Sequence, residues 1–135
     1  MNSRFAVATL AGTVVLFVVG YLLWGLAFAD FMAGNAGSAT GVIKDPPGFL
    51  WLLVGQIVGA ALLTLVLGWR GVTDVATGLK TGAVFGLLMG LAVDATMYAT
   101  ANISNLTATL VDPVLVAIQM GLAGAVIGMM LGRSE

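Results

Sequence analysis

The sequence predicts an all-α fold, a four-helix transmembrane bundle with both termini in the cytoplasm (N-in/C-in). Of its 135 residues, 60% are hydrophobic and only 8% are charged, whereas a soluble domain carries roughly 25% charged residues. Four segments are apolar over the roughly 20 residues that a helix needs to span a bilayer, and basic residues gather at one set of their ends. We therefore expect a single transmembrane domain over residues 1–135.

The first expected span, residues 5–31, directly follows Arg4. The triplet Ala27-Phe28-Ala29 fits a signal-peptide cleavage pattern, but the apolar run of about 25 residues is longer than a signal core of roughly 7–15 residues. We therefore interpret the segment as a retained span. A loop over residues 32–48 follows, because its glycines and the Pro46-Pro47 pair exclude a regular helix.

The second expected span covers residues 49–69, and the third covers residues 75–99. Trp51 and Trp69 stand near the two ends of the second span, as tryptophans that anchor a helix at the membrane interfaces do. Asp74 directly precedes the third span and is a candidate N-cap, because its side chain can accept a hydrogen bond from the first turn.

The fourth expected span covers residues 105–131, with two alternative starting points. It begins at Asn105 if the apolar run is read in full. It begins at Pro113 if Asp112 is the cap, because aspartate suits the N-cap and proline suits the first helical position. We interpret Asp112 as a helix cap on this basis.

Basic residues predict the orientation. Cytoplasmic ends of spans carry an excess of lysine and arginine. Only Lys44 lies at one set of span ends, and the other set carries Arg4, Arg70, Lys80 and Arg133. Both termini are therefore expected in the cytoplasm, and the bacterial character of the sequence suggests a multi-pass protein of the bacterial cytoplasmic (inner) membrane.

The composition excludes several function classes. The chain has no cysteine and no histidine, which removes thiolate nucleophiles, zinc sites, the usual haem ligands and the commonest general base. The net charge of −1 and the lack of a basic run argue against a nucleic-acid partner. We expect no enzymatic activity, no catalytic residue, no cofactor and no metal site.

Glycine recurs every four residues in the third span and again in the fourth. Residues four apart form a ridge on a helix, and a ridge of glycines is a groove that a neighbouring backbone can approach closely. Close contact matters because burial of apolar surface does not drive helix association in lipid. We therefore expect helix packing at Gly78, Gly82, Gly86, Gly90, Gly124 and Gly128.

Asp94 is the unusual residue of the third span, because a charged side chain at the bilayer centre costs about 2.5–3.5 kcal/mol on insertion scales. It lies roughly 9 Å beyond the midplane at 1.5 Å per residue, so it must face the bundle interior or water. Asp30 is expected at the interface and solvated. The residues expected to line a ligand-binding pocket in the outer half are Asp94, Gln56, Gln119, Tyr98, Tyr21 and Trp24.

Two interpretations of Asp94 stay open. In the first, the carboxyl group is protonated and donates a hydrogen bond across the bundle. In the second, it lines a water-accessible pocket and binds a proton, a cation or a small polar ligand. A lone intramembrane carboxyl group is a candidate functional site, although no sequence motif accompanies it.

The segments "GYLLWGLAFADFMAGNAGSATGV" and "MYATANISNLTA" and the glycine-rich fourth span carry a resemblance. Through these segments the chain resembles an uncharacterised family of small four-span bacterial inner-membrane proteins, of the domain-of-unknown-function type. The resemblance covers most of the chain and implies a four-span fold without an assigned activity. The first span lacks the membrane-embedded glutamate that small multidrug exporters use.

The sequence therefore favours a small polytopic, non-enzymatic membrane protein with an outer-half polar pocket around Asp94. That pocket would bind or conduct a small polar species or an ion. The alternative is a structural accessory subunit of a larger membrane complex, which would dock through its glycine-rich helix grooves. The expected partners are membrane lipids, and either further copies of the chain in a homo-oligomer or other membrane protein subunits.

Overall fold

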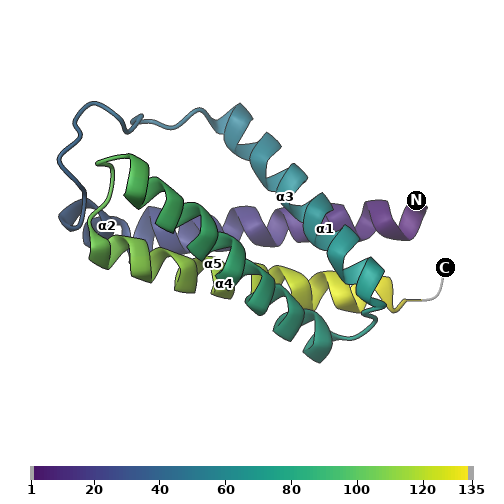
Figure 1. Ribbon diagram of the computed structural model, residues 1–135. Helices are drawn as coiled ribbons and strands as arrows, with labels where there is room; N and C mark the ends of the chain where they lie inside the picture. The colour runs from purple at the N-terminus through teal and green to yellow at the C-terminus, as the bar shows by residue number, and fades with distance from the viewer. Residues whose placement is uncertain (1, 134–135) are drawn as a thin grey trace.

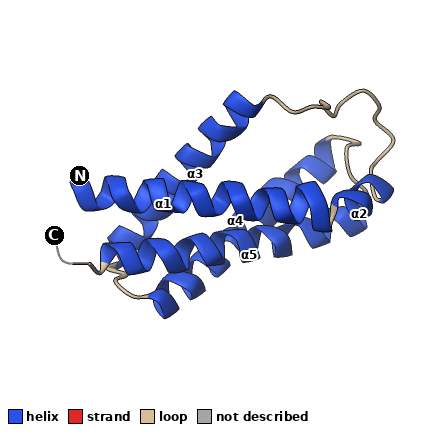
Figure 2. Ribbon diagram, turned by 180° about the vertical axis from the view of Figure 1, so that it is seen from behind, coloured by secondary structure: helices blue, strands red, loops and turns tan. Residues whose placement is uncertain are grey.

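The computed structural model in Figure 1 describes residues 2–133. Its helices are α1 (Ser3–Gly20), the π-helical segment η1 (Tyr21–Ala27), α2 (Ala29–Gly34), α3 (Phe49–Arg70), α4 (Val75–Thr100) and α5 (Leu106–Leu131). Within residues 2–133 the only β pairing is one isolated bridge between Ala36 and Ser104, and Figure 2 shows helices joined by loops. The predicted all-α four-helix bundle is confirmed.

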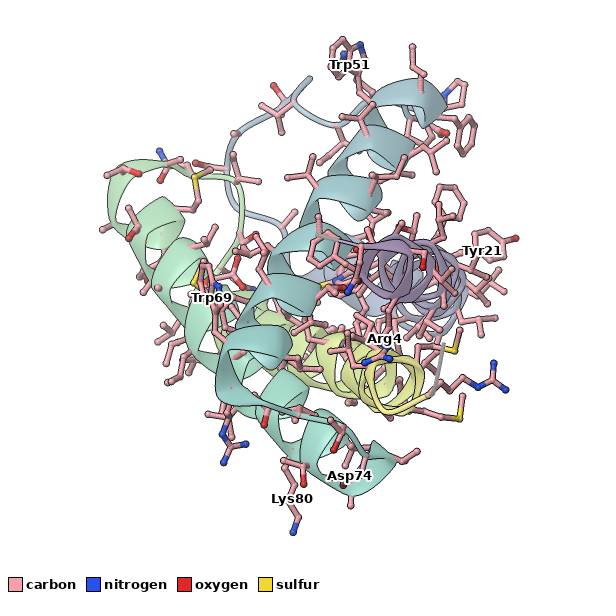
Figure 3. All side chains as sticks on the ribbon, turned by 90° about the vertical axis from the view of Figure 1, so that its right-hand side faces the viewer. Arg4, Tyr21, Trp51, Trp69, Asp74 and Lys80 are labelled. Carbon is pink, nitrogen blue, oxygen red and sulfur yellow. The ribbon has the colours of Figure 1, made fainter. Side chains whose placement is uncertain are left out.

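Four helical stretches are long and apolar enough to cross a membrane, with mean hydropathy between 1.5 and 2.3. They are α1 with η1, α3, α4 and α5. The chain is therefore a small multi-pass membrane protein. The N-terminus, the α3–α4 turn and the end of α5 lie together at one end of the bundle (Figure 1), here named the inner end, and the opposite end is the outer end. Figure 3 looks onto the inner end, where Arg4, Asp74 and Lys80 lie.

Short polar residues begin the helices of the α4–α5 pair. Asp74 Oδ1 accepts a hydrogen bond from the Thr77 amide at 2.8 Å, so Asp74 caps α4 as predicted. Hydrogen bonds from the backbone and then the side chain of Thr77 hold the pKa of Asp74 below its usual range. At the outer end, Asn105 Oδ1 accepts a hydrogen bond from the Ala108 amide at 2.9 Å and caps α5.

The prediction that Asp112 caps the fourth helix is wrong. Asn105 takes the capping position, and α5 continues through Asp112 and Pro113 without a break. A proline inside a helix removes one backbone donor, but transmembrane helices tolerate proline where neighbouring groups satisfy the freed backbone. Asp112 is therefore available for a contact inside the bundle.

The first span is shorter than the expected residues 5–31 and contains a segment that the pattern did not predict. The Phe28 amide donates to the Leu23 carbonyl oxygen at 2.7 Å, and such a bond to the fifth preceding residue is the mark of a π-helix. Phe28 then leaves helical geometry, with φ −113° and ψ 11°. The span ends at Ala27, and α2 is a separate short helix.

The α4–α5 pair makes the most extensive contact between the described helices. On the inner half of α4, a Cβ atom added at Gly78 would overlap the carbonyl oxygen of Gly124, and one added at Gly82 would overlap that of Met120. In return, a Cβ atom at Gly124 would lie 3.2 Å from Gly82 Cα and would overlap the Gly78 carbonyl oxygen. Only glycine lets two backbones come this close.

The same contact continues on the outer half of α4. A Cβ atom added at Gly86 would lie 2.7 Å from the Val116 carbonyl oxygen, and one added at Gly90 would lie 3.1 Å from Pro113 Cα. All four glycines of α4 are buried in this way. The contact with α5 therefore runs along one face of α4 nearly to its outer end.

α1 and α3 complete the bundle at the inner end. A Cβ atom at Gly12 of α1 would lie 2.6 Å from Ile127 Cδ1 of α5, so Gly12 makes room for that side chain. Toward the outer end α3 diverges from the other helices (Figures 1 and 3). There Trp51 is 75% exposed. The core is composed of Ala8, Leu16, Ala60, Leu63, Leu67, Val72, Ala123 and Ile127.

An outer clasp, residues 35–39 paired with residues 102–105, joins the long loop to the α4–α5 connection. The Gly37 amide donates to the Ile103 carbonyl oxygen at 2.8 Å, and the Asn105 amide donates to the Asn35 carbonyl oxygen at 3.0 Å. The side chains of Asn105 and Asn35 are also bonded, at 3.0 Å. The clasp holds the start of the loop above the outer ends of α4 and α5.

We expect Gly82→Ala to lower the free energy of unfolding by about 1–3 kcal/mol, the usual cost of overpacking, since the added methyl group would overlap the Met120 carbonyl oxygen. Gly55→Ala is the matched control, because nothing lies within 4 Å of a Cβ atom there. Alanine is the better helix former by about 1 kcal/mol, so the control should be neutral or more stable. Unfolding of both variants in mild detergent measures the difference, and equal stabilities would contradict the α4–α5 contact.

We expect Ser38→Cys to react with a membrane-impermeant thiol reagent on intact cells or spheroplasts, and Thr73→Cys to react only after permeabilisation. Both positions are exposed, and the chain has no other cysteine. The physical reason is the excess of basic residues at the inner end, which favours retention of that end in the cytoplasm. Labelling of Thr73→Cys alone on intact cells would reverse the orientation.

Candidate functional site: an outer carboxyl pocket

Four of the six predicted ligand-binding residues fall into two groups at different depths. Asp94 and Tyr98 line a pocket near the outer ends of α4 and α5. Gln119 lies at the middle of α5 and contacts Gln56 of α3. The pocket lining does not include either glutamine, so the structure places the two groups in separate sites.

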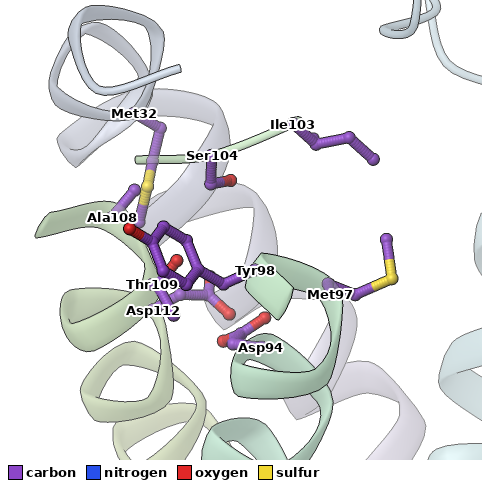
Figure 4. A pocket seen from close by; sticks show the side chains of 9 residues that line it. All are labelled: Met32, Asp94, Met97, Tyr98, Ile103, Ser104, Ala108, Thr109 and Asp112. Carbon is purple, nitrogen blue, oxygen red and sulfur yellow. The ribbon is translucent and has the colours of Figure 1, made fainter. Parts of the chain in front are cut away.

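The pocket is a partly open cavity of about 190 Å³ lined by residues of α2, α4, α5 and the α4–α5 connection. None of its lining residues is basic, and two of them are acidic. Figure 4 shows the lining side chains, which are Met32, Asp94, Met97, Tyr98, Ile103, Ser104, Ala108, Thr109 and Asp112.

The glycine contact determines which residue of α5 faces Asp94. One step of four residues outward on α4 leads from Gly90 to Asp94. Gly90 packs against Val116, and the corresponding step toward the outer end of α5 leads from Val116 to Asp112. The two aspartates therefore stand at matching positions of the antiparallel pair, and Figure 4 shows their carboxyl groups side by side.

Asp112 is held by a donor from the first span. Trp24 Nε1 donates a hydrogen bond to Asp112 Oδ1 at 2.7 Å. Trp24 belongs to η1, and π-helical segments occur frequently at functional sites. Trp24 therefore takes part in the site through Asp112 and is not itself a lining residue of the cavity.

Asp94 has an oxygen without a donor. Its Oδ2 atom is buried and accepts no hydrogen bond from any residue between positions 2 and 133. Thr96 and Thr100, which are close along α4, donate instead to carbonyl oxygens of their own helix. The neighbouring carboxyl group of Asp112 is close enough to interact with that of Asp94. A shared proton or a bound cation would relieve the repulsion between the two groups and supply the missing partner.

The glutamines form an interhelical contact that ties three helices together. Gln119 is buried, and its Nε2 donates to the Leu16 carbonyl oxygen of α1 at 2.8 Å and lies 3.5 Å from Gln56 Oε1 of α3. Hydrogen bonds between membrane helices contribute roughly 0.6–2 kcal/mol each. This arrangement suits a structural role for both amides.

Two of the polar residues considered from sequence lie outside the cavity. Tyr21 is 58% exposed, and Figure 3 shows its ring on the outside of the bundle. Asp30 is exposed in the first turn of α2, in keeping with the expected solvated position. Neither side chain is part of the pocket lining.

Comparison with protein-family models, with curated proteins and with solved structures gives no match to the chain. The resemblance to a family of four-span bacterial membrane proteins therefore stays a prediction. The chemistry of the pocket is the basis on which a function can be inferred.

Proposed function

We propose that this chain is a non-enzymatic protein of the bacterial cytoplasmic membrane whose outer pocket binds or conducts a small polar species, and that this species is a cation. The observation that carries the proposal is the pairing of Asp94 with Asp112 in a cavity without a basic lining residue. A cleft with one sign of charge and low-dielectric walls concentrates ions of the opposite sign. Such a pocket attracts a cation and repels an anion.

The charge of the pair favours a monovalent cation. Two carboxyl groups that share a site do not both ionise readily, because like charges in contact repel. One proton shared between Asp94 and Asp112 leaves a single negative charge, which one monovalent cation neutralises. Divalent calcium usually takes 6–8 oxygen ligands, and the described part of the chain has no cluster of three or more metal-ligating residues.

The facing carboxyl groups also favour a second candidate, a membrane hydrolase. Paired aspartates that share one proton are the catalytic groups of aspartic proteases. The cavity of about 190 Å³ is comparable with one of about 150 Å³ that holds a benzene-sized molecule, so it suits a small ligand better than an extended peptide. Binding is therefore the better supported of the two.

The accessory-subunit alternative receives less support from the packing. The glycines of α4 are buried against α5 of the same chain, so these grooves are occupied. A partner subunit or a second copy of the chain would have to use other surfaces. Lipid would cover the exposed apolar residues of α3 and α4.

We expect Asp94→Asn to fold normally and to lose cation binding, because asparagine keeps the size and hydrogen-bonding capacity of aspartate without its charge. The measurement is the thermal stability of the parent and the variant in detergent, in the presence of each of a series of monovalent chlorides at constant pH. A cation at a hundredfold excess over its Kd adds about 2.7 kcal/mol to the stability of the parent and nothing to that of the variant. Vesicles with a cation-sensitive dye then report whether the bound ion also crosses.

Asp30→Asn is the matched control, since it removes an exposed carboxyl group outside the pocket. It should respond to every cation as the parent does. If the parent and Asp94→Asn respond alike to every cation tried, the pocket does not select cations through Asp94 and the proposal fails.

A further inference from the structure

The size of the cavity limits what can fill it. A cavity of about 150 Å³ holds a benzene-sized molecule, and one water occupies about 30 Å³ of liquid. The outer pocket has about 190 Å³. A proton or a bare alkali ion would leave most of that space to water, whereas a cation with several carbon atoms would fill it.

The walls of the cavity have two chemical characters. One side carries the carboxyl groups of Asp94 and Asp112. The rest of the lining is mixed: the hydroxyl residues Ser104 and Thr109 are polar, whereas the Tyr98 ring lies beside Asp94 and the Met32 thioether lies on the Tyr98 side (Figure 4). Alkali metal ions favour oxygen ligands on all sides, whereas an aromatic face attracts organic ammonium groups by the cation–π interaction.

The two carboxyl groups have different tasks. Asp112 Oδ1 is held by Trp24 at 2.7 Å, which fixes the orientation of that carboxyl group. Asp94 accepts no hydrogen bond at its buried Oδ2 atom from any described residue, and the charged group that interacts with it is the like-charged carboxyl group of Asp112. Asp94 is therefore the group that gains most from an incoming positive charge.

We propose that the ligand of the outer pocket is a small organic ammonium cation, with its charged nitrogen at the Asp94–Asp112 pair and its carbon substituents against Tyr98 and Met32. This inference rests on the proposed cation-binding function and names the class of ligand. Tyr98 is then the residue that sets the preference for organic over inorganic cations, because its ring supplies the face that an alkali ion does not need.

Equilibrium dialysis of the full chain in detergent against radiolabelled tetramethylammonium tests the proposal. We expect saturable binding that Asp94→Asn abolishes, and unlabelled tetramethylammonium should displace the label at a concentration at least about tenfold lower than sodium or potassium chloride does. Tyr98→Leu should weaken tetramethylammonium binding about tenfold. Tyr98→Phe keeps the aromatic face and should bind as the parent does, which separates the role of the ring from a folding defect.

Two contrary results are distinguishable by parallel dialysis against radiolabelled sodium and rubidium. Binding of these ions that depends on Asp94, with tetramethylammonium bound more weakly or not at all, would overturn the organic-cation inference and leave the proposed function standing. The absence of any binding that depends on Asp94 would overturn both. Equal binding of tetramethylammonium by Tyr98→Leu and Tyr98→Phe would overturn the inference that the Tyr98 ring selects organic cations.

Discussion

The close approach of the α4 and α5 backbones is the constraint on which the rest of the structure depends. Carbonyl oxygens of one helix lie where Cβ atoms of the other would be, as at Gly78 and Gly82. In lipid, such contact replaces the hydrophobic effect as the force that holds helices together. It also leaves little freedom for one helix to slide or rotate against the other. The relative register of α4 and α5 is therefore fixed. It extends to the outer part of α4, where the next position of the four-residue glycine series is Asp94.

This fixed register turns a packing motif into a chemical site. Gly90 packs against Val116. One step of four residues outward from this contact leads to Asp94 on α4 and to Asp112 on α5, so two carboxyl groups meet at one depth of the bundle. The other elements complete the surroundings. η1 presents the Trp24 indole to Asp112, and the outer clasp holds α2 and the α4–α5 connection over the cavity. The inner half contains packed aliphatic side chains and buried threonines, of which Thr13 and Thr64 donate to carbonyl oxygens of their own helices, so the paired carboxyl groups lie on the outer side alone.

The four spans could be predicted from the sequence because length and hydropathy suffice to define them. Asp112 could also have been placed beside Asp94, because it continues the four-residue steps of Gly128 and Gly124 along the fourth span. The Asp-Pro pair resembles a helix start, and that local signal led to the wrong assignment. η1 was not predictable, since its residues are as apolar as the helix before it. Gln119 lies near the middle of α5 because that helix begins at Leu106, whereas the alternative start at Pro113 would have placed it close to the depth of Asp94.

Cysteine cross-linking in this cysteine-free chain measures the α4–α5 register most directly. A double variant with Asp94→Cys and Asp112→Cys should be cross-linked in most molecules by a short thiol-specific reagent in native membranes. The control pairs Asp94→Cys with Ile118→Cys, which lies on an exposed face of α5 and should stay unlinked. If the control pair links as readily, or if the 94–112 pair does not link in folded protein, the two carboxyl groups do not share a site and the cation-binding pocket does not exist.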